Sequence, residues 1–475
     1  MNLIPRITVD VVDDDPTPQV GAAGVVGILG NFEQANSTTI YDAPTERDAK
    51  ILLGRDKAYS GTECIEQLFK KTSISSGVER IVAYQLGERT GAKTILKSVA
   101  SEDPITEPPE EPGNESTEEN NGPKDLIELE ASGGNWGKNL KVTVTDASFK
   151  PDTYKIIITL NDEVLISFNN ITLISFITRL NNSKVNITAR SLVDEDDFKL
   201  EKVVDQEFSG GTESNDFTIQ DIITALDNLK EEKFNLLVFS EEIDVDFYPA
   251  IEEALTNKFK NDKPTNTLLS LPESDNVQEA VAIMNNTPSG NISFNYQRYN
   301  ELGIHASTAR IAGFVAGLNV NISPGNKVID DIYRVTPELS PDEMEMLLDA
   351  GAMVLKMKDR QANSYKIVNA FTATQRRDKK GEKIVTSSLY AKRKQNYIID
   401  FFDLEDWLGR TDIDHNVTTA KGEIKSREKI LLDKKIVKDI TTTVTWVDGY
   451  LKIFFDAVIS KEVGEIKKLI RIKAE

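Results

Sequence analysis

The chain has 475 residues, of which 39% are hydrophobic and 28% charged, and its formal net charge is -21. Phosphate binding needs a basic surface, so this acidic excess argues against nucleic acid as a partner. A single cysteine excludes an internal disulfide, and no apolar run approaches the ~18 residues that span a bilayer. The first residues carry no secretion signal, which predicts synthesis and folding in a reducing cytosol.

Residues 1–20 are predicted to form an N-terminal arm. Ile7, Val9 and Val11 alternate with polar residues at the period of a strand. The segment 13–18, which contains three aspartates and two prolines, then breaks this pattern. A short strand followed by an acidic hinge is unusual in a self-contained domain, and it indicates a segment that pairs elsewhere.

Residues 21–89 and 210–373 are predicted to form one discontinuous α/β domain. Short apolar runs typical of buried strands alternate there with amphipathic segments typical of helices. The expected strands are 25–30, 80–84, 234–239 and 267–269, and the expected helices are 45–53, 60–71, 218–229, 247–259 and 277–284. Ser340 opens a further helix with a capping box. This alternation implies a largely parallel sheet.

Residues 90–209 interrupt the α/β pattern and are predicted to form an inserted, β-rich outer domain. The segment 101–123 is rich in Glu, Pro, Asn and Ser and has no basic residue, which predicts a disordered surface loop. Short alternating segments follow at 140–144, 154–158 and 164–168. The acidic loop favours an exposed position for this domain.

Residues 374–475 are predicted to form a C-terminal α+β domain that ends in a C-terminal arm. Its expected elements are a helix near 387–408, a basic helix near 424–440 and a final strand pair. In the last stretch Ile466, Ile470 and Ile472 interleave with basic residues. This pattern gives the C-terminal arm an apolar face and a positive charge.

The residues that could carry chemistry do not form a recognisable site. Gly21, Gly24, Gly27 and Gly30 lie beside or within the first strand, whereas a dinucleotide fingerprint needs its glycines at the turn from strand to helix. These glycines are predicted to allow close packing of the strand against a helix. The two histidines, His305 and His415, have neither each other nor the cysteine nearby. We therefore predict no catalytic residue, no metal site and no cofactor.

Two further features are predicted to serve packing. Cys64 falls in an expected helix, where a buried thiol acts as a small apolar residue. The segment Gly313–Gly317 has small residues four apart, a spacing that lets two helices approach closely. The stretch around it is too short to cross a membrane, so we expect a tight helix contact inside the α/β domain.

Three segments resemble, in order and spacing, the tail sheath family of contractile phages and related injection machines. They are residues 132–142, with Gly-Gly-Asn-Trp-Gly before an alternating strand; residues 208–213, with a Gly-Gly pair before the helix that follows Asp221; and residues 307–317, with an Ala-Gly helix. The resemblance covers most of residues 20–475. Lys138 stands where the family has Asn, and the Pro-Gly-Val-Tyr opening common in the family is missing.

The resemblance implies a structural subunit, not an enzyme, that polymerises helically around an inner tube and contracts to drive the tube through a cell envelope. The expected fold is an α/β sheath core domain with an inserted β-rich domain, a C-terminal α+β domain and extended terminal arms. The expected partners are further copies of the chain, the inner tail tube protein, and the baseplate and tail-terminator proteins, without nucleic acid or direct membrane insertion. The expected location is a virion tail or injection particle that is assembled in the host cytoplasm.

Two groups of residues are predicted to make contacts between subunits. The two chain ends have apolar stripes and opposite charges, which favours strand exchange within one sheet, and the resemblance implies that a charged helix of an innermost C-terminal domain touches the tube. The arm residues are Ile4, Ile7, Val9, Val11, Ile466, Ile470 and Ile472. The tube-facing candidates are Lys425, Arg427, Lys429, Lys434, Lys435 and Lys438, followed by Arg376, Arg377 and residues 392–394. Arms that fold back onto their own subunit, and a solvated helix face, are the alternatives.

Two other functions remain open from the sequence. Another self-assembling surface or lattice protein would need an export signal, and a nucleotide-dependent α/β enzyme would need a phosphate loop. Neither feature is found in the sequence.

Overall fold

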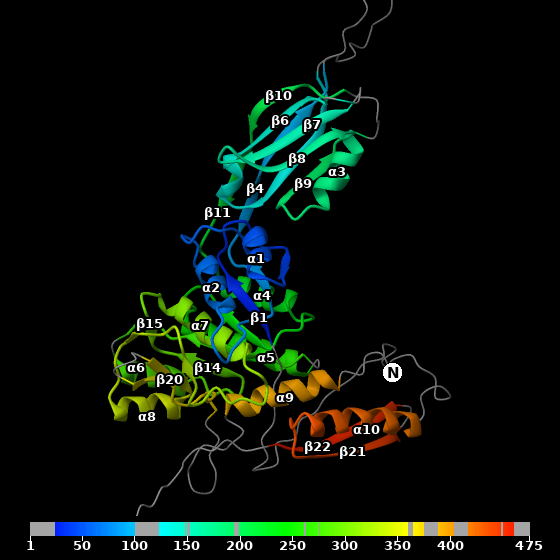
Figure 1. Cartoon of the computed structure of the whole chain (residues 1–475). Coiled ribbons are helices and arrows are strands. Elements are labelled where there is room, and N and C mark those ends of the chain that lie inside the picture. The colour runs from blue at the N-terminus through cyan, green and yellow to red at the C-terminus, as the bar shows by residue number, and fades with distance from the viewer. Residues whose placement is uncertain are drawn as a thin grey trace, which may run out of the picture.

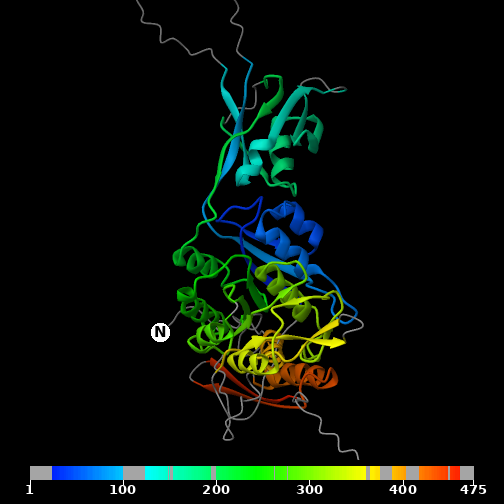
Figure 2. The same ribbon diagram turned by 90° about the vertical axis from the view of Figure 1, so that its left-hand side faces the viewer.

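The computed structural model describes residues 24–99, 123–147, 149, 153–193, 199–260, 263–274, 276–359, 364–374, 388–402, 417–447 and 450–459. Both predicted arms and nearly all of the acidic segment 101–123 lie outside the described residues. The described part is elongated (Figures 1 and 2). A β-rich unit lies at one end, an α/β unit in the middle, and a small unit of helix and sheet at the other end.

A seven-stranded sheet forms the centre of the α/β unit, in the order β18-β14-β13-β12-β1-β3-β2. Neighbouring strands are parallel, except that β2 runs antiparallel to β3. The strands are β1 (Val25–Gly30), β2 (Ile40–Ala43), β3 (Arg80–Gln85), β12 (Leu236–Phe239), β13 (Asn266–Ser270), β14 (Ile292–Asn295) and β18 (Ala352–Met353). Because β1 lies between two strands and under helices on both faces, its sequence is apolar almost without interruption. The predicted mixed α/β class with a largely parallel sheet is confirmed.

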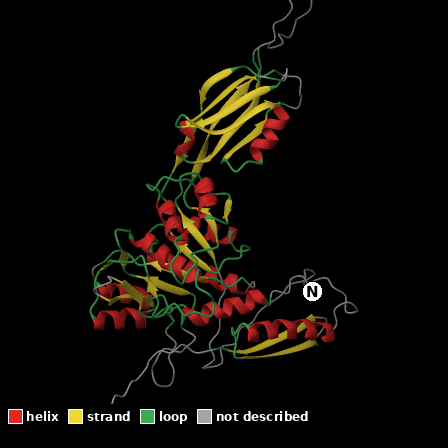
Figure 3. Ribbon diagram, in the orientation of Figure 1, coloured by secondary structure: helices red, strands yellow, loops and turns green. Residues whose placement is uncertain are grey.

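Helices cover both faces of this sheet, as the red ribbons of Figure 3 show. Ile28 and Leu29 of β1 point to opposite faces because successive side chains of a strand alternate. Ile28 belongs to the core cluster that includes residues of α1, α2 and α7, and Leu29 belongs to the cluster that includes residues of α4, α5, α6 and α8. The helices are α1 (Glu46–Leu53), α2 (Ser60–Phe69), α4 (Ile219–Asn228), α5 (Tyr248–Lys260), α6 (Val277–Asn285), α7 (Ile304–Ala316) and α8 (Pro341–Ala350).

Two small sheets lie at the side of the α/β unit. One joins β15 (Arg298–Tyr299) to β17 (Val335–Thr336), and the other has the order β16-β20-β19, with β16 (Val328–Ile329), β20 (Ser364–Ile367) and β19 (Leu355–Asp359). Their buried residues Ile329, Val335 and Ile367 join the cluster that contains Ile28. The small sheets therefore extend the core of the α/β unit.

Local sequence signals place several helices where they were predicted. Ser340 and Glu343 form the expected capping box at the start of α8, and Thr218 and Asp221 form another at the start of α4. Gly313 of α7 lies against α2, where a Cβ atom would fall 2.3 Å from the Leu68 carbonyl oxygen. The predicted tight helix contact is thus confirmed.

The glycines of β1 also allow close packing, but the predicted partner was wrong. A Cβ atom on Gly27 would fall 2.8 Å from the ring of Phe234, and one on Gly30 would fall 1.8 Å from Ser240 Oγ. Phe234 and Ser240 lie at the two ends of β12, so the close neighbour is the adjacent strand segment and not a helix. Gly21 lies outside the described residues.

The β-rich unit contains two four-stranded antiparallel sheets, in the orders β11-β4-β5-β9 and β10-β6-β7-β8. Its elements are β4 (Arg89–Lys97), β5 (Asp125–Gly133), η1 (Asn135–Asn139), β6 (Leu140–Asp146), β7 (Tyr154–Leu160), β8 (Glu163–Ile171), α3 (Leu173–Asn181), β9 (Ile187–Ser191), β10 (Val203–Glu207) and β11 (Ser209–Glu213). Side chains from both sheets and from α3 share one core. Trp136 of η1 belongs to that core, and its indole nitrogen donates to the Ser132 carbonyl at 3.1 Å.

The C-terminal unit consists of α10 (Val417–Asp433), β21 (Asp439–Val447) and β22 (Tyr450–Val458), and α9 (Leu389–Phe401) precedes it. The prediction of a basic helix that continues to Ile440 was wrong. Lys435 has a φ of 57°, and the amide of Ile436 donates to the carbonyl of Leu431. This left-handed residue with its crossed hydrogen bond is a Schellman cap, which ends α10 and turns the β-branched run that follows into a strand.

Candidate functional site

Helix α9 joins the C-terminal unit to the α/β unit. It crosses the amino ends of β12 and β13, where Asn396 Nδ2 donates to Asn266 Oδ1 at 2.9 Å and Asn235 Nδ2 donates to Asp400 Oδ2 at 3.2 Å. The ring of Phe402, just after α9, lies 4.2 Å from that of Phe455 in β22. Helix α9 therefore contacts both units, and its polar and aromatic contacts fix its position between them.

Two charged side chains of α9 are buried at this junction. Arg393 donates to the carbonyls of Leu318 and Ile322, at 2.5 and 3.3 Å, and Lys394 donates to the Ile436 carbonyl at 2.8 Å. Burial lowers the pKa of Arg393 to about 10 and that of Lys394 to about 8. The selection of these two residues as second-choice tube contacts was wrong, because both side chains are buried and bind backbone carbonyls of the same chain.

The other second-choice candidates have different positions. Lys392 is half-buried on α9, and its ammonium group donates to Gln395 Oε1 at 3.2 Å. Arg376 and Arg377 lie outside the described residues. In the part of the chain that the structure describes, the basic surface of this region therefore lies on α10 and the turn after it.

The sheet of the C-terminal unit has only two strands in the described part of the chain, β21 and β22, which pair antiparallel over their full length. Its inner face, with Val444 and Phe455, packs against Ile424 and Leu431 of α10. Each strand has its outer edge unpaired within the described residues. A two-stranded sheet is marginal by itself, and an unpaired edge offers a row of amides and carbonyls to a further strand.

The outer face of this two-stranded sheet is exposed. Thr441, Thr443 and Phe454 lie on it, and Phe454 is 55% exposed. Thr443 and Phe454 are directly opposite each other in the register. Threonines beside exposed aromatic and aliphatic side chains make a surface that can pack against a partner as well as face water.

The six predicted tube-facing residues do not lie on one helix. Lys425, Arg427 and Lys429 are on α10, Lys434 and Lys435 form the turn after it, and Lys438 directly precedes β21. The five lysines are exposed, whereas Arg427 is half-buried and donates to the Phe401 carbonyl at 2.8 Å. Arg427 thus attaches α10 to the end of α9. These exposed lysines, called the basic strip below, lie on a chain whose net charge is -21, with Asp433 and Asp439 exposed beside them.

The predicted arm residues are not among the residues that the structure describes. Ile4, Ile7, Val9 and Val11 at one end, and Ile466, Ile470 and Ile472 at the other, lie outside the described residues. The chain leaves the described region at Ile459, directly after β22. Ile466 follows Ile459 by seven positions in the sequence.

Elsewhere in the described chain, the residues that could carry chemistry are buried or hydrogen-bonded. Within the described ranges, no cluster of three or more His, Cys, Asp or Glu side chains could hold a metal ion. Cys64 is buried in α2, as predicted, and burial raises the pKa of its thiol. His305 lies 3.1 Å from Ser270 Oγ, and burial lowers the pKa of its imidazole to about 4. His415 is outside the described residues.

None of the helices in the described part of the chain combines the length and the hydropathy needed to span a membrane.

Comparison with known proteins gives one family match within the chain and a similar fold along it. Residues 215–370 match the model of the phage tail sheath protein central domain. No curated protein matches the sequence.

Solved structures extend the similarity beyond this central region. A sheath tail protein from Listeria innocua has 15% identity and a TM-score of 0.62, over 93% of this chain and 96% of that one. One from Desulfitobacterium hafniense has 14% identity and a TM-score of 0.59, over 96% and 100%. The helical sheath of the anti-feeding prophage in its contracted state has 10% identity and a TM-score of 0.50, over 100% and 99%. The chain therefore matches a sheath central domain over residues 215–370, and along nearly its whole length its fold is similar to that of contractile tail sheath proteins.

Proposed function

We propose that the chain is the structural subunit of a contractile sheath that polymerises helically around an inner tube. The observation that carries this proposal is the open-edged sheet of the C-terminal unit, on a chain with a sheath fold. A head-to-tail contact whose rotation does not close produces an open helical filament. The sheath is assembled in an extended, kinetically trapped state, and its contraction drives the tube through a cell envelope.

The three units take different radial positions in this proposal. The α/β domain comprises residues 21–89 and 210–373, the inserted β-rich domain (90–209) faces outward, and the C-terminal domain (374–475) faces the tube. The β-rich and C-terminal units lie at opposite ends of the described chain, which supports this assignment (Figures 1 and 2). The acidic segment within the insertion is then directed away from the tube.

The terminal arms are proposed to complete the two-stranded sheet of neighbouring subunits. A donated strand satisfies the open edges of β21 and β22 with backbone hydrogen bonds, and the hinge behind it bends while those bonds persist. Ile7, Val9 and Val11 give the N-terminal arm an apolar face, and Ile466 and Ile470 give one to the C-terminal arm. Opposite charges on the two arms favour their pairing within one sheet.

Removal of residues 1–15 or 466–475 tests this coupling. We expect each truncated chain to be a folded monomer, by circular dichroism and sedimentation, that no longer forms polymers. Deletion of the acidic segment 101–123 is the matched control, because it removes more residues without touching an arm, and it should leave polymerisation intact. Polymers of normal length from either arm truncation contradict the arm proposal.

The basic strip of the C-terminal unit is proposed to contact the tube protein. Each exposed ion pair contributes only about 0–1 kcal/mol, but repetition along a polymer multiplies weak contacts. We expect the double reversal Lys434→Glu and Lys435→Glu to weaken co-sedimentation with tube and to spare polymers made without tube. The control reverses Lys356 and Lys358, two exposed lysines of β19 in the α/β unit, with the same change of charge. Equal tube binding by both double variants would exclude this strip as the contact.

The same proposal sets the remaining partners and the location. Baseplate and tail-terminator proteins bind the two ends of the polymer, and the particle is a virion tail or an injection device assembled in the cytoplasm of its host. The chain acts mechanically and not as an enzyme. Cys64 is part of the hydrophobic core, and His305 contacts Ser270. Both positions support this view.

A further inference from the structure

The α/β sheet has a topological switch point between β1 and β12. From β1 the chain proceeds to β3 on one side, and the strands from β12 to β14 continue on the other side. In open α/β sheets, ligands bind in the crevice that forms at such a point, outside the carboxyl ends of the strands. Here β1 ends at Gly30 and β12 ends at Phe239, so Asn31 and Ser240 lie at the mouth of this crevice.

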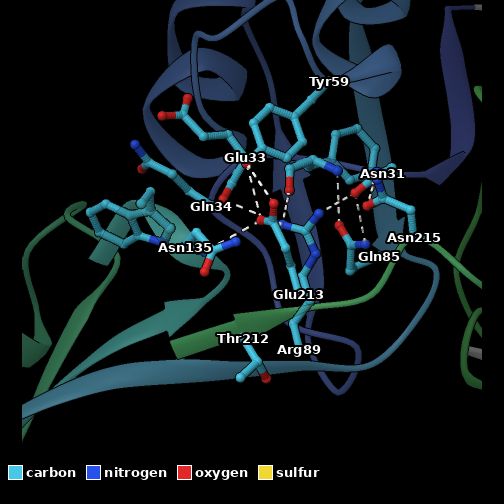
Figure 4. A network of polar contacts seen from close by, with 12 residues as sticks. Asn31, Glu33, Gln34, Tyr59, Gln85, Arg89, Asn135, Thr212, Glu213 and Asn215 are labelled. Atoms are coloured by element: carbon cyan, nitrogen blue, oxygen red, sulfur yellow. Dashed lines mark hydrogen bonds and ion pairs between the residues drawn. The ribbon is translucent and has the colours of Figure 1, made fainter. Parts of the chain in front are cut away.

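The crevice is filled by the chain itself. The side chain of Arg89, the first residue of β4, is fully buried there and donates to the Phe32 carbonyl and to Asn31 Oδ1 (Figure 4). Asn31 Nδ2 in turn donates to Asn215 Oδ1 at 2.5 Å. The space that holds a ligand in related sheets therefore holds an arginine from the first strand of the β-rich unit.

Glu213, the last residue of β11, binds the same arginine. Its carboxylate lies 3.7 Å from Arg89 Nη1 and accepts hydrogen bonds from the Tyr59 hydroxyl at 3.0 Å and the Asn135 amide at 3.3 Å. Tyr59 precedes α2 of the α/β unit, whereas Asn135 begins η1 of the β-rich unit. One carboxylate therefore contacts both units at the point where the chain crosses between them.

At neutral pH the Glu213 carboxylate is ionised and the Tyr59 hydroxyl is protonated, as their hydrogen bond requires. Partial burial raises the pKa of Glu213, but the hydrogen bonds from Asn135 and Tyr59 and the charge of Arg89 outweigh it, and the pKa lies below its ordinary value. Burial and the Glu213 carboxylate raise the pKa of Tyr59 to about 12, so its hydroxyl keeps the proton that it donates. Nearby Glu241 is more buried, and burial raises the pKa of its carboxyl.

We propose that Asn31, Tyr59, Arg89, Asn135 and Glu213 form a latch that fixes the orientation of the β-rich unit on the α/β unit. The chain crosses between the units only through β4 and β11, which would otherwise be a two-stranded hinge. Loss of one partner leaves a buried charge without compensation, which favours opening of the junction over retention of the closed arrangement. The latch belongs to the single subunit and is independent of whether the chain forms a sheath.

Other contacts between the two units include an ion pair and hydrogen bonds from Asn186. Lys184 pairs with Asp48 at 2.6 Å, but the lysine side chain is 71% exposed. Asn186 donates to the carbonyls of Leu52 and Gln34 from the loop before β9. We therefore expect the orientation of the β-rich unit to depend on the latch more than on the Lys184 ion pair.

The test is a distance measurement between spin labels in the monomer. The labels are attached at Ser167→Cys on β8 and Asn257→Cys on α5, two exposed positions in different units, while buried Cys64 remains unlabelled. We expect a narrow distance distribution for the parent chain, and for Glu213→Gln a broader one with an added population at a shifted distance. The control Lys184→Met removes a charge at the same junction and should keep the narrow distribution.

A second, milder variant distinguishes loss of the latch from loss of the fold. Tyr59→Phe removes one hydrogen bond to Glu213 and keeps the ring, and we expect it to broaden the distribution in the same direction but less. Circular dichroism of both variants should equal that of the parent chain. Distributions as narrow as the parent in both folded variants overturn the proposal, and so does equal broadening by Lys184→Met.

Discussion

The two ends of the molecule differ in how far each unit builds a hydrophobic core from its own residues. In the β-rich unit two four-stranded sheets enclose a core drawn entirely from residues 92–208, and α3 packs along its side. In the C-terminal unit two strands and one helix share a core with α9 and with Val320 of the α/β unit. One unit is complete by itself, whereas the other depends on its neighbours.

This difference indicates where the chain invites partners. A sheet with enough strands to bury one face is stable alone, but a two-stranded sheet needs further packing or further strands. In the proposed sheath the β-rich unit faces outward, so we expect changes on its surface to leave assembly intact. In the proposed sheath, strands from outside complete the sheet of the C-terminal unit, which is also the unit that carries the exposed lysines.

The largest expected effect comes from separating the units. We expect a fragment of residues 91–212 to fold alone and to melt cooperatively by circular dichroism, since its core uses no residue outside that range. A fragment of residues 388–475 should lack a cooperative transition, because its sheet is short of strands and its helix α9 has lost the contacts to Asn235 and Asn266. A folded monomer from the second fragment would show that the two-stranded sheet is stable without those α9 contacts or further strands.

A smaller effect should appear in the pH dependence of the C-terminal unit. Lys394 has a pKa of about 8 in the folded chain, below the ordinary 10.5, because it is buried. Between about pH 8 and 10 the unfolded chain keeps a proton that the folded chain has lost, so stability rises with pH, by about 1.4 kcal/mol per unit at most. We expect Lys394→Met to remove this rise, measured as hydrogen exchange of the amides from Ile436 to Val444, corrected for intrinsic rates.

The control for Lys394 lies in the α/β unit. Lys258 of α5 donates to the carbonyls of Leu229 and Glu232 beyond the end of α4, and burial lowers its pKa to about 8 as well. Lys258→Met should therefore change the pH dependence of exchange in α4 and α5 and leave the C-terminal unit as it was. A retained rise at Ile436–Val444 in Lys394→Met would contradict the assignment to that lysine.

The smallest effect is a gain in stability at Gly422. It lies within α10, and a Cβ atom added there meets nothing within 4 Å. Gly422→Ala should therefore stabilise the C-terminal unit by about 0.5–1 kcal/mol, seen as slower exchange in α10. Gly313→Ala, where a Cβ atom would fall 2.3 Å from the Leu68 carbonyl oxygen, should destabilise the α/β unit by about 1–3 kcal/mol. Equal changes in stability for the two variants would contradict the difference in packing around the two glycines.

The α/β unit could be predicted from sequence because its signals are local. Val25–Gly30 is a buried strand by composition, and Ser340 with Glu343 marks a helix start by hydrogen bonding within four residues. The strands of the β-rich unit at 140–144, 154–158 and 164–168 were also found from their alternation. Pairing between β4 and β11, more than a hundred residues apart, has no such local signal.

The candidate site was less predictable, because burial of a charge depends on tertiary contacts. Arg393 and Lys394 follow Lys392 in a basic run that suggests a solvated face, yet both reach backbone carbonyls brought near by folding. Lys435 takes the left-handed conformation that usually belongs to glycine, so the end of α10 was missed. Arg89 and Glu213 are separated along the chain by the whole insertion, and nothing in the sequence pairs them.

The register of β4 with β11 has a practical consequence for engineering. Glu213 lies directly opposite Arg89, so the chain enters and leaves the β-rich unit at neighbouring points of one antiparallel pair. A foreign domain whose own termini are adjacent could therefore replace the β-rich unit without moving the strands of the α/β sheet. Each subunit would then carry one copy of the grafted domain, and a polymer of such subunits would display it at a regular helical spacing.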